Sequence, residues 1–185
     1  MWNKKVQAVL RAVFLLAVSV ILGVNVYNWN ARNLTGNALP MPFGYGGAVV
    51  LSGSMEPAIK VDELIIVKAE KMYEVGDVVV YQTGLIPVVH RIVDMDEQTA
   101  ITRGDANNTE DSPILLSQIK GRVIAHIPHV GKAVRLLKTP AVTILLIICA
   151  VLTVELPYLK EKERKEEELE RIKAEIRRLK EEQEN

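Results

Sequence analysis

The sequence predicts a mainly β fold, in which a compact antiparallel, barrel-like domain is attached to a membrane by apolar helices. Three observations support this prediction. Short runs rich in β-branched residues alternate with turn residues in the middle of the chain. Two long uncharged stretches flank that middle part, and a charged stretch ends the chain. At 185 residues, the chain has room for one extramembrane domain with its own core.

The charge and cysteine content narrow the classes of partner and site. Lysine plus arginine and aspartate plus glutamate number 23 each, so the formal net charge is zero. Such a chain has no overall field that attracts nucleic acid, and we expect no nucleic-acid partner. The single cysteine, Cys149, lies in an apolar run and therefore cannot form an internal disulfide or a cysteine metal cluster. We expect it to be a packing residue.

The first uncharged stretch, Ala12 to Ala31, has about 20 residues, the length that a helix needs to cross the hydrocarbon core. It predicts a transmembrane segment within an N-terminal region of residues 1–32. The basic residues before it indicate that the N-terminus is cytoplasmic and that the following residues are outside. A cleaved signal peptide is the alternative, which the early Arg11 disfavours. Aromatic residues typical of the membrane interface lie near its ends: Trp2, Tyr27 and Trp29.

Residues 33–47 contain prolines and glycines without periodicity, and they predict a linker to the first strand. We expect that strand at Val49-Val50-Leu51. Consecutive valines at Val78-Val79-Val80 and at Val88-Val89 predict strands that are covered on both faces. With these runs the β domain is expected at residues 48–138. The further strands are predicted at Glu63 to Ala69, Asp77 to Thr83, Val88 to Asp94, Thr99 to Arg103 and Gly121 to Ile127.

A second uncharged run, Thr139 to Val154, has Pro140 near its start, a favoured residue in the first turn of a helix. With about 16 residues the run is near the lower limit for a membrane span, and Leu156 to Leu159 extend it. We therefore expect a second transmembrane segment at residues 139–159. A helix lying on the membrane is the competing interpretation.

The tail, residues 160–185, predicts a charged cytoplasmic helix. Its charges alternate in sign, and pairs such as Glu161 and Lys165 have the i, i+4 spacing that supports an exposed helix. An apolar seam in the tail spans only about two heptads, which favours a solvated helix over a coiled coil. The seam consists of Leu169, Ile172, Ile176 and Leu179.

Ser54 is the candidate nucleophile because it lies on a sharp turn, with Gly53 before it and Pro57 after it. A serine hydroxyl is a poor nucleophile until a neighbouring base takes its proton. His90 is a candidate base, since its strand could run beside the serine and a neutral imidazole is available near pH 7. The other candidate bases are Lys60, Lys68 and Lys71.

We expect no metal ion and no cofactor. His126 and His129 flank Pro128, but further acidic ligands are lacking close by in the sequence, so a zinc site there is not predicted. The proposed chemistry needs only side chains of the protein.

Five short motifs occur in the order in which type I signal peptidases carry them, so residues 48 to about 131 resemble that family. Histidine at position 90 is similar to the archaeal and endoplasmic-reticulum subtype, because the common bacterial enzymes carry lysine there. The motifs are Ser52-Gly53-Ser54-Met55-Glu56-Pro57, Gly76-Asp77-Val78-Val79, Val89-His90-Arg91, Arg103-Gly104-Asp105 with Asn107, Asn108 and Asp111, and Gly121-Arg122-Val123.

The resemblance implies a role for each site residue. Ser54 would be the nucleophile and His90 the general base. Asp111 is the favoured residue to orient the imidazole; Asp105 is the second candidate, and otherwise a carboxylate that organises the loop. The Ser52 hydroxyl would join the Ser54 amide in an oxyanion hole, where it would stabilise the charge that develops on the scissile carbonyl.

The expected substrate is an extended peptide with small side chains near the cut. It would add as a strand between residues 48–51 and 87–89, with backbone hydrogen bonds supplying affinity. The apolar residues Val50, Met55 and Val89 would form shallow substrate-binding pockets that exclude large side chains.

The resemblance therefore implies a membrane-bound serine endopeptidase that removes N-terminal signal peptides from exported preproteins after small residues, through an acyl-enzyme intermediate. Its expected location is the cell membrane, or the endoplasmic-reticulum membrane in a eukaryote, with the catalytic domain on the exterior side. Its expected partners are signal peptides, membrane lipid, and translocation machinery or accessory subunits. Two alternatives remain: a catalytically inactive, membrane-anchored peptide-binding β-domain, and a self-cleaving serine protease of the same fold.

Overall fold

The computed structural model describes residues 4–183 and the side chains of residues 5–178. The roles expected for Trp2 and for the seam residue Leu179 therefore fall on side chains outside the described part. The chain divides into two compact units, one of residues 21–142 and one formed by residues 1–20 together with 143–185. The first unit contains the β domain and the candidate site.

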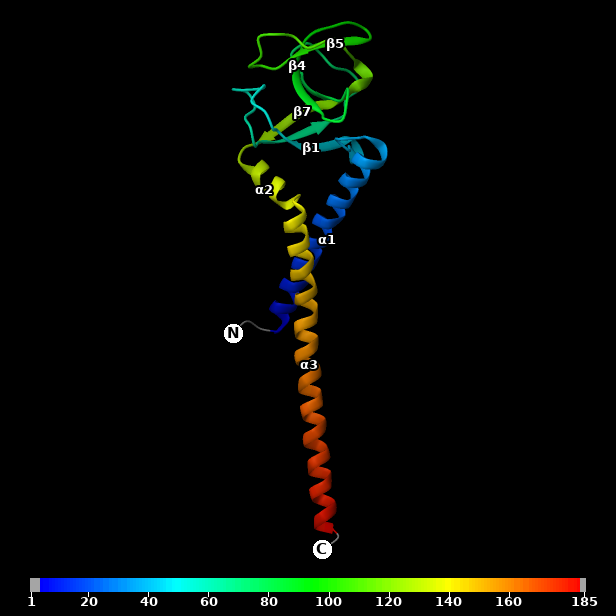
Figure 1. Ribbon diagram of the computed structural model, residues 1–185, viewed down its shortest axis with the longest axis vertical. Helices are drawn as coiled ribbons and strands as arrows, with labels where there is room; N and C mark the ends of the chain where they lie inside the picture. Colours follow the sequence, from blue (N-terminus) through cyan, green and yellow to red (C-terminus); the bar gives the residue numbers. More distant parts are fainter. Residues whose placement is uncertain (1–3, 184–185) are drawn as a thin grey trace. The chain divides into compact units, whose positions relative to one another are not determined.

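The β domain is built on one antiparallel sheet of seven strands in the order β1-β2-β7-β3-β4-β5-β6. Irregularities in register at Ile66/Val67, Val80/Tyr81 and Ile92/Asp94 bend the strands, and the sheet curls on itself (Figure 1). The predicted barrel-like antiparallel fold is thus confirmed. The strands are β1 (Tyr45–Val49), β2 (Leu64–Lys68), β3 (Val78–Tyr81), β4 (Val88–Met95), β5 (Thr99–Arg103), β6 (Ile114–Leu115) and β7 (Ile119–Ile127).

The first strand begins earlier than the sequence predicts. Strand β1 starts at Tyr45, and Val50 and Leu51 lie beyond its end, so the last three residues of the predicted linker 33–47 are strand. Gly46 and Gly47 make this strand hard to predict from the sequence, because glycine is depleted in strands and contributes no side-chain pattern. Leu51, expected in a buried strand, is 68% exposed.

The core consists of two apolar clusters. One contains Met55 with residues of β2 and β3, and the other packs Val79 with β4, β5 and the residues around β6. Val79 and Val80 are both fully buried, which confirms that β3 is covered on both faces. In β4, Val88 and Val89 are half-buried, so this strand is covered less completely than predicted.

Within the described residues, two long helices are apolar enough, by length and composition, to cross a membrane. Helix α1 (Lys4–Thr35) contains the first predicted span, and Tyr27 and Trp29 are exposed on it. Helix α3 (Pro140–Gln183) begins at Pro140 as predicted and continues through Pro157 into the charged tail without a break. The short helix α2 (Val130–Leu137), which the sequence did not predict, precedes α3.

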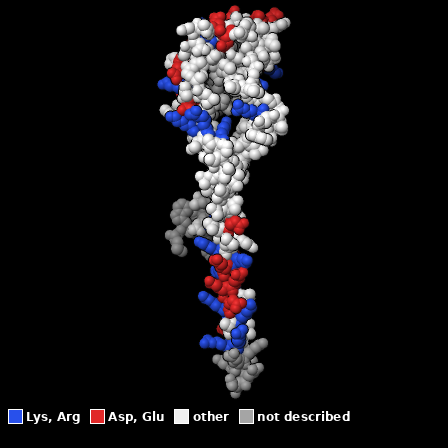
Figure 2. Space-filling view, viewed as in Figure 1, with Lys and Arg blue, Asp and Glu red and all other residues white. Residues whose placement is uncertain are grey.

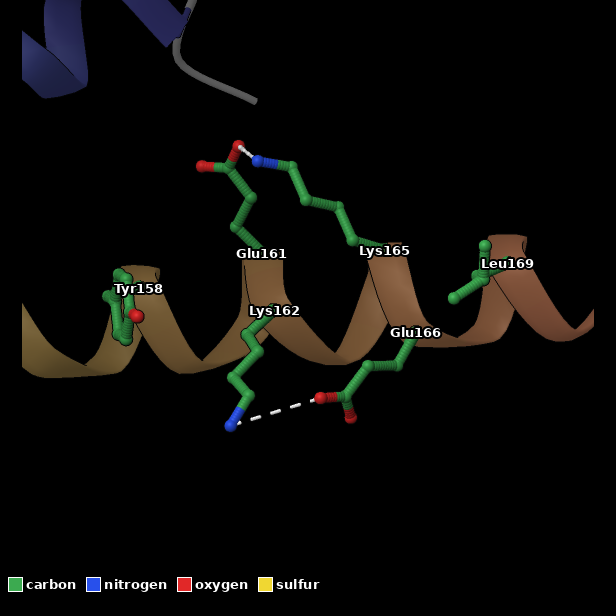
Figure 3. Close-up of a pocket in the computed structure, with 6 residues that line it drawn as sticks. All are labelled: Tyr158, Glu161, Lys162, Lys165, Glu166 and Leu169. Carbon is green, nitrogen blue, oxygen red and sulfur yellow. Dashed lines mark ion pairs between the residues drawn. The ribbon is translucent and has the colours of Figure 1, made fainter.

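Charge divides α3 into two parts. Its first part lacks charged side chains until Glu155, and its last part carries closely alternating acids and bases (Figure 2). Lys165 Nζ lies 3.1 Å from Glu161 Oε1, and Lys162 Nζ lies 3.8 Å from Glu166 Oε1 (Figure 3). The i, i+4 pair predicted at Glu161 and Lys165 is therefore present, on a helix surface that is exposed.

Candidate active site

Ser54 lies on an excursion of the chain between β1 and β2, and the two ends of this excursion are held together. The Val50 N–H donates to Glu63 O, and the Asp62 N–H donates to Val50 O, each at 3.0 Å. Within the excursion, Met55 is 1% exposed and packs into the core together with Ile59. The burial of Met55 fixes the turn and leaves the preceding residue, Ser54, at the surface, where it is half-buried.

The loop after β5 holds the Ser54 turn from another side. The Ala106 N–H donates to Ser54 O at 2.9 Å, and a Cβ placed on Gly104 would lie only 2.6 Å from the same oxygen. Glycine at position 104 therefore permits a close approach of two backbone segments. This contact joins the serine motif to the acidic loop, which lies about 50 residues further along the chain.

His90 on β4 forms a close pair with Asp111. His90 Nδ1 lies 2.6 Å from Asp111 Oδ2, and His90 is 7% exposed. The carboxylate is an acceptor, so Nδ1 carries the proton in this contact and Nε2 remains free to accept one. This is the tautomer that a general base for a serine hydroxyl requires.

Two further hydroxyls donate to the same carboxylate oxygen. Thr102 Oγ1 lies 2.7 Å and Tyr81 Oη 3.1 Å from Asp111 Oδ2. Burial alone would raise the pKa of Asp111, but the hydrogen bonds from Thr102, His90 and Tyr81 outweigh it and lower the pKa below its usual 3.8. The carboxylate is therefore ionised at neutral pH. Burial raises the pKa of the Tyr81 hydroxyl, which stays protonated as a donor.

Asp105 contacts Arg91 instead of the histidine. Arg91 Nε and Nη2 donate to the two carboxylate oxygens of Asp105 at 2.8 and 2.7 Å, and Arg91 Nη1 donates to Gly76 O at 2.8 Å. The hydrogen bond to Asp105 raises the pKa of the Arg91 side chain. A bidentate pair of this kind holds the loop after β5 to β4. The geometry thus matches the loop-organising position considered for Asp105.

The strand register links the His90 strand to the segment that contacts Ser54. In the β4–β5 ladder Arg91 is paired with Arg103, and His90 and Gly104 are the residues that adjoin this pair on the two segments. Gly104 in turn lies against the backbone of Ser54. Among the described residues, the Ser54 hydroxyl has one side-chain partner, the Ser52 hydroxyl at 3.3 Å, and no hydrogen bond joins it to His90.

The predicted substrate-binding residues gather in one cluster. Val50 and Met55 belong to the first core cluster, and Val89 packs against it as a half-buried residue. The β4–β5 ladder begins at Arg91, so in the described part of the chain Val88 and Val89 have a ladder partner on β3 but none on β5. This stretch of β4 therefore presents a free backbone edge.

Two of the other basic residues considered from the sequence, Lys68 and His126, have partners elsewhere. Lys68 Nζ pairs with Glu70 at 3.0 Å, and His126 Nδ1 lies 2.6 Å from Glu63 Oε2. His126 is on β7, opposite Ile65 of β2. These contacts assign both residues to pairs outside the His90 neighbourhood.

Sequence reasoning missed Tyr81 and Thr102. Neither residue lies in a motif that suggests chemistry, because Tyr81 ends a run of valines and Thr102 alternates with apolar residues in β5. The only hint is that Thr102 is a polar residue at an inward position of a strand, and it is fully buried in the structure.

No family model matches the chain. Several curated proteins, however, are similar to it in sequence. The signal peptidase complex catalytic subunit SEC11 of Metarhizium acridum is 32% identical over 134 residues, which cover 63% of this chain and 75% of the relative. The protein of that name from Komagataella phaffii is 32% identical over 138 residues, 63% of this chain and 78% of the relative. That from Ogataea parapolymorpha is 38% identical over 109 residues, 45% of this chain and 62% of the relative.

These identities extend over most of the length of two of the three relatives, and the aligned part is large enough to include the β domain. The motif order, the His90–Asp111 pair and the curled antiparallel sheet agree with them. The chain belongs to the SEC11 family of type I signal peptidases, the endoplasmic-reticulum and archaeal subtype.

Proposed function

We propose that this protein is a membrane-bound serine endopeptidase that removes N-terminal signal peptides from preproteins. The observation that carries the proposal is the contact of His90 Nδ1 with Asp111 Oδ2 at 2.6 Å; Asp111 follows the loop whose Ala106 N–H donates to Ser54 O. Nucleophile, base and orienting carboxylate thereby come from three separate parts of the sequence. Family membership supports the choice of reaction, since the relatives are named catalytic subunits of a signal peptidase complex.

The proposed reaction begins with attack of Ser54 Oγ on the scissile carbonyl carbon while His90 Nε2 takes the hydroxyl proton. The oxyanion that forms accepts hydrogen bonds from the Ser54 N–H and the Ser52 hydroxyl, which already lies 3.3 Å from Ser54 Oγ. His90 then gives its proton to the leaving amine, and an acyl-enzyme remains on Ser54. A water molecule, deprotonated by His90, hydrolyses that ester and restores the serine.

Among the described contacts none joins the Ser54 hydroxyl to His90, and contacts between a nucleophile and its base often tighten only in the Michaelis complex. A substrate strand laid against the free edge at Val88 and Val89 would supply backbone hydrogen bonds. Small side chains of the substrate would then face the cluster of Val50, Met55 and Val89.

We further propose that residues 1–32 and 139–159 cross the membrane, that residues 33–47 connect to the peptidase domain at 48–138, and that residues 160–185 are cytoplasmic. The two apolar helices support this arrangement. Signal peptides and lipid would be direct partners, and accessory subunits would be further partners, because the relatives are named subunits of a complex. Labelling of the C-terminus from each side of the membrane tests the second crossing, and accessibility from the same side as the β domain would refute it.

The test of function uses the full-length protein in detergent with a preprotein and with its mature form. We expect cleavage after a small residue by the wild-type protein and none by Ser54→Ala. Ser117→Ala, an exposed serine in the turn before β7, is the matched control and should cleave normally. Cleavage by Ser54→Ala at the wild-type rate would refute the mechanism. Binding without cleavage by the wild type would favour the inactive peptide-binding alternative, and cleavage of the chain itself would favour the self-cleaving one.

A further inference from the structure

Three donors converge on one oxygen of Asp111, and two of them belong to residues outside the family motifs. His90 Nδ1, Thr102 Oγ1 and Tyr81 Oη lie 2.6, 2.7 and 3.1 Å from Asp111 Oδ2. A carboxylate oxygen has about two lone pairs, so a third donor must share them. The two hydroxyls thus compete with the imidazole for the charge of the carboxylate.

Both hydroxyls are shielded from bulk water. Thr102 is fully buried and Tyr81 is 5% exposed, so neither exchanges its contact for bulk water. Thr102 holds Asp111 twice, because its carbonyl oxygen also accepts from the Asp111 N–H at 2.8 Å. Tyr81 comes from β3, where its ring is tilted by 60° to the His90 ring at a centroid separation of 6.5 Å. Donors from β3 and β5, the strands on either side of β4, therefore both hold the carboxylate that pairs with His90.

We propose that Tyr81 and Thr102 are positioning residues of the peptidase site: together they fix the orientation of Asp111 and limit how strongly its charge holds a proton on His90. Thr102 mainly sets the orientation, since it makes the shorter hydroxyl contact and the backbone contact. Tyr81 mainly withdraws negative charge from Asp111 Oδ2 through the hydrogen bond that its hydroxyl donates. The inference rests on the proposed function, because it assigns these residues to the base that would serve Ser54.

Two arginines on β4 and β5, close in sequence to His90 and Thr102, are each paired with an acid in the described structure. On β4 and in the loop, Arg91 is paired with Asp105. At the end of β5, Arg103 lies 3.8 Å from Glu110. Tyr81 is the titratable group that β3 directs at Asp111. A change of the pH profile after removal of one hydroxyl can therefore be assigned to the donors on Asp111.

The test measures kcat, KM and the pH profile of kcat/KM for a signal-peptide substrate with full-length Thr102→Val, Thr102→Ser and Tyr81→Phe proteins. Loss of a hydrogen bond to a charged group predicts a fall in kcat of about 10- to 100-fold for Thr102→Val. For the longer Tyr81 contact we expect about 3- to 10-fold. KM should change little, because Tyr81 pairs with Val88 on the side of β4 opposite its free edge and Thr102 lies on β5. Thr102→Ser should restore activity to within about twofold.

The acid limb of the profile should move to higher pH in Tyr81→Phe and Thr102→Val. Without a competing donor more negative charge remains on Oδ2, and His90 keeps its proton to higher pH. Thr99→Val is the matched control, because Thr99 Oγ1 donates to Asp96 Oδ2 at 2.9 Å at the other end of β5. Tyr73→Phe is the second control, a half-buried tyrosine packed against the same core cluster. Both controls should leave kcat and the acid limb at wild-type values.

A second readout does not depend on catalysis. The His90 Nδ1 proton, held in a short hydrogen bond, should give a downfield NMR resonance in the wild type, and this resonance should shift in Tyr81→Phe and Thr102→Val but not in the controls. An unshifted resonance together with an unmoved acid limb would overturn the proposal, as would equal effects of Thr102→Val and Thr99→Val. If the wild type shows the resonance and the two variants shift it, but the wild type cleaves no preprotein, the proposed function fails while the positioning role holds.

Discussion

Gly104 offers a sharp test of how the site is assembled, because a single methyl group would separate its two halves. An alanine Cβ at position 104 would lie 2.6 Å from Ser54 O and 2.9 Å from Asn107 Nδ2. To reach the 3.4 Å of ordinary contact, the two backbone segments must move apart by roughly 0.8 Å. The nearest atom is backbone, so no side-chain rotation relieves the clash. The φ of Gly104 lies outside the left-handed region, and the effect of alanine is therefore steric alone.

The expected consequence is a loss of activity larger than the loss of stability. Overpacking of this kind costs about 1–3 kcal/mol of unfolding free energy. A displacement approaching 1 Å of catalytic groups costs about 100-fold in rate, and Gly104 lies directly against the backbone of the Ser54 turn. We therefore expect Gly104→Ala to fold, to unfold at lower temperature, and to lose about 100-fold in kcat/KM.

The assay combines thermal unfolding in detergent with initial rates of preprotein cleavage, normalised to folded protein. Gly84→Ala is the neutral control, since no atom lies within 4 Å of its added Cβ. Gly121→Ala is the steric control, because its Cβ would meet the backbone of Lys68 in the β2–β7 ladder instead of Ser54. It should lower the unfolding temperature but keep most of the activity. A kcat/KM for Gly104→Ala within threefold of that for Gly121→Ala would refute the reasoning.

Three further predictions concern the carboxylates and the substrate edge. Asp111→Asn should lower kcat by about 10³- to 10⁴-fold with little change in KM, because an amide no longer selects the Nδ1–H tautomer of His90. Asp105→Asn should act mainly by loosening the Arg91 contact and lowering the unfolding temperature. Kinetics and calorimetry on both variants check this, and the reverse ranking would exchange the two roles. Because folding lowers the pKa of Asp111 below 3.8, the contribution of the ionised carboxylate to stability should be complete above that pH and be lost as the pH falls through the lower, folded-state pKa. Chemical unfolding of the wild type and of Asp111→Asn from pH 2 to 6 measures this contribution. The wild type should lose unfolding free energy as the pH falls, and the variant should lack that loss. Val89→Ala should admit larger side chains beside the cut and Val89→Phe should exclude all but the smallest, as judged from the products of a set of preproteins; an unchanged preference for both would remove Val89 from the pocket.

Much of the fold follows from local patterns in the sequence. The helix starting at Pro140, the positions of β2 to β5 and β7, and the i, i+4 pair Glu161–Lys165 all depend on neighbours within a few residues, and the structure has each of them. Strand β1 was displaced in the prediction because its two glycines supply no hydrophobic alternation. Helix α2 was missed because eight residues give too short a periodic pattern.

The sequence by itself determined that a serine turn, a strand histidine and an acidic loop occur in the order of a signal peptidase, because the types and order of residues are fully visible in it. Only the tertiary structure decided which acid reaches His90. Asp105 and Asp111 lie in one aperiodic loop, whose path is set by hydrogen bonds to Ser54 and Thr102 and by the Arg91 pair. The roles of Tyr81 and Thr102 likewise emerge only when β3, β4 and β5 lie side by side, because strand register, not sequence distance, brings their hydroxyls to one carboxylate oxygen.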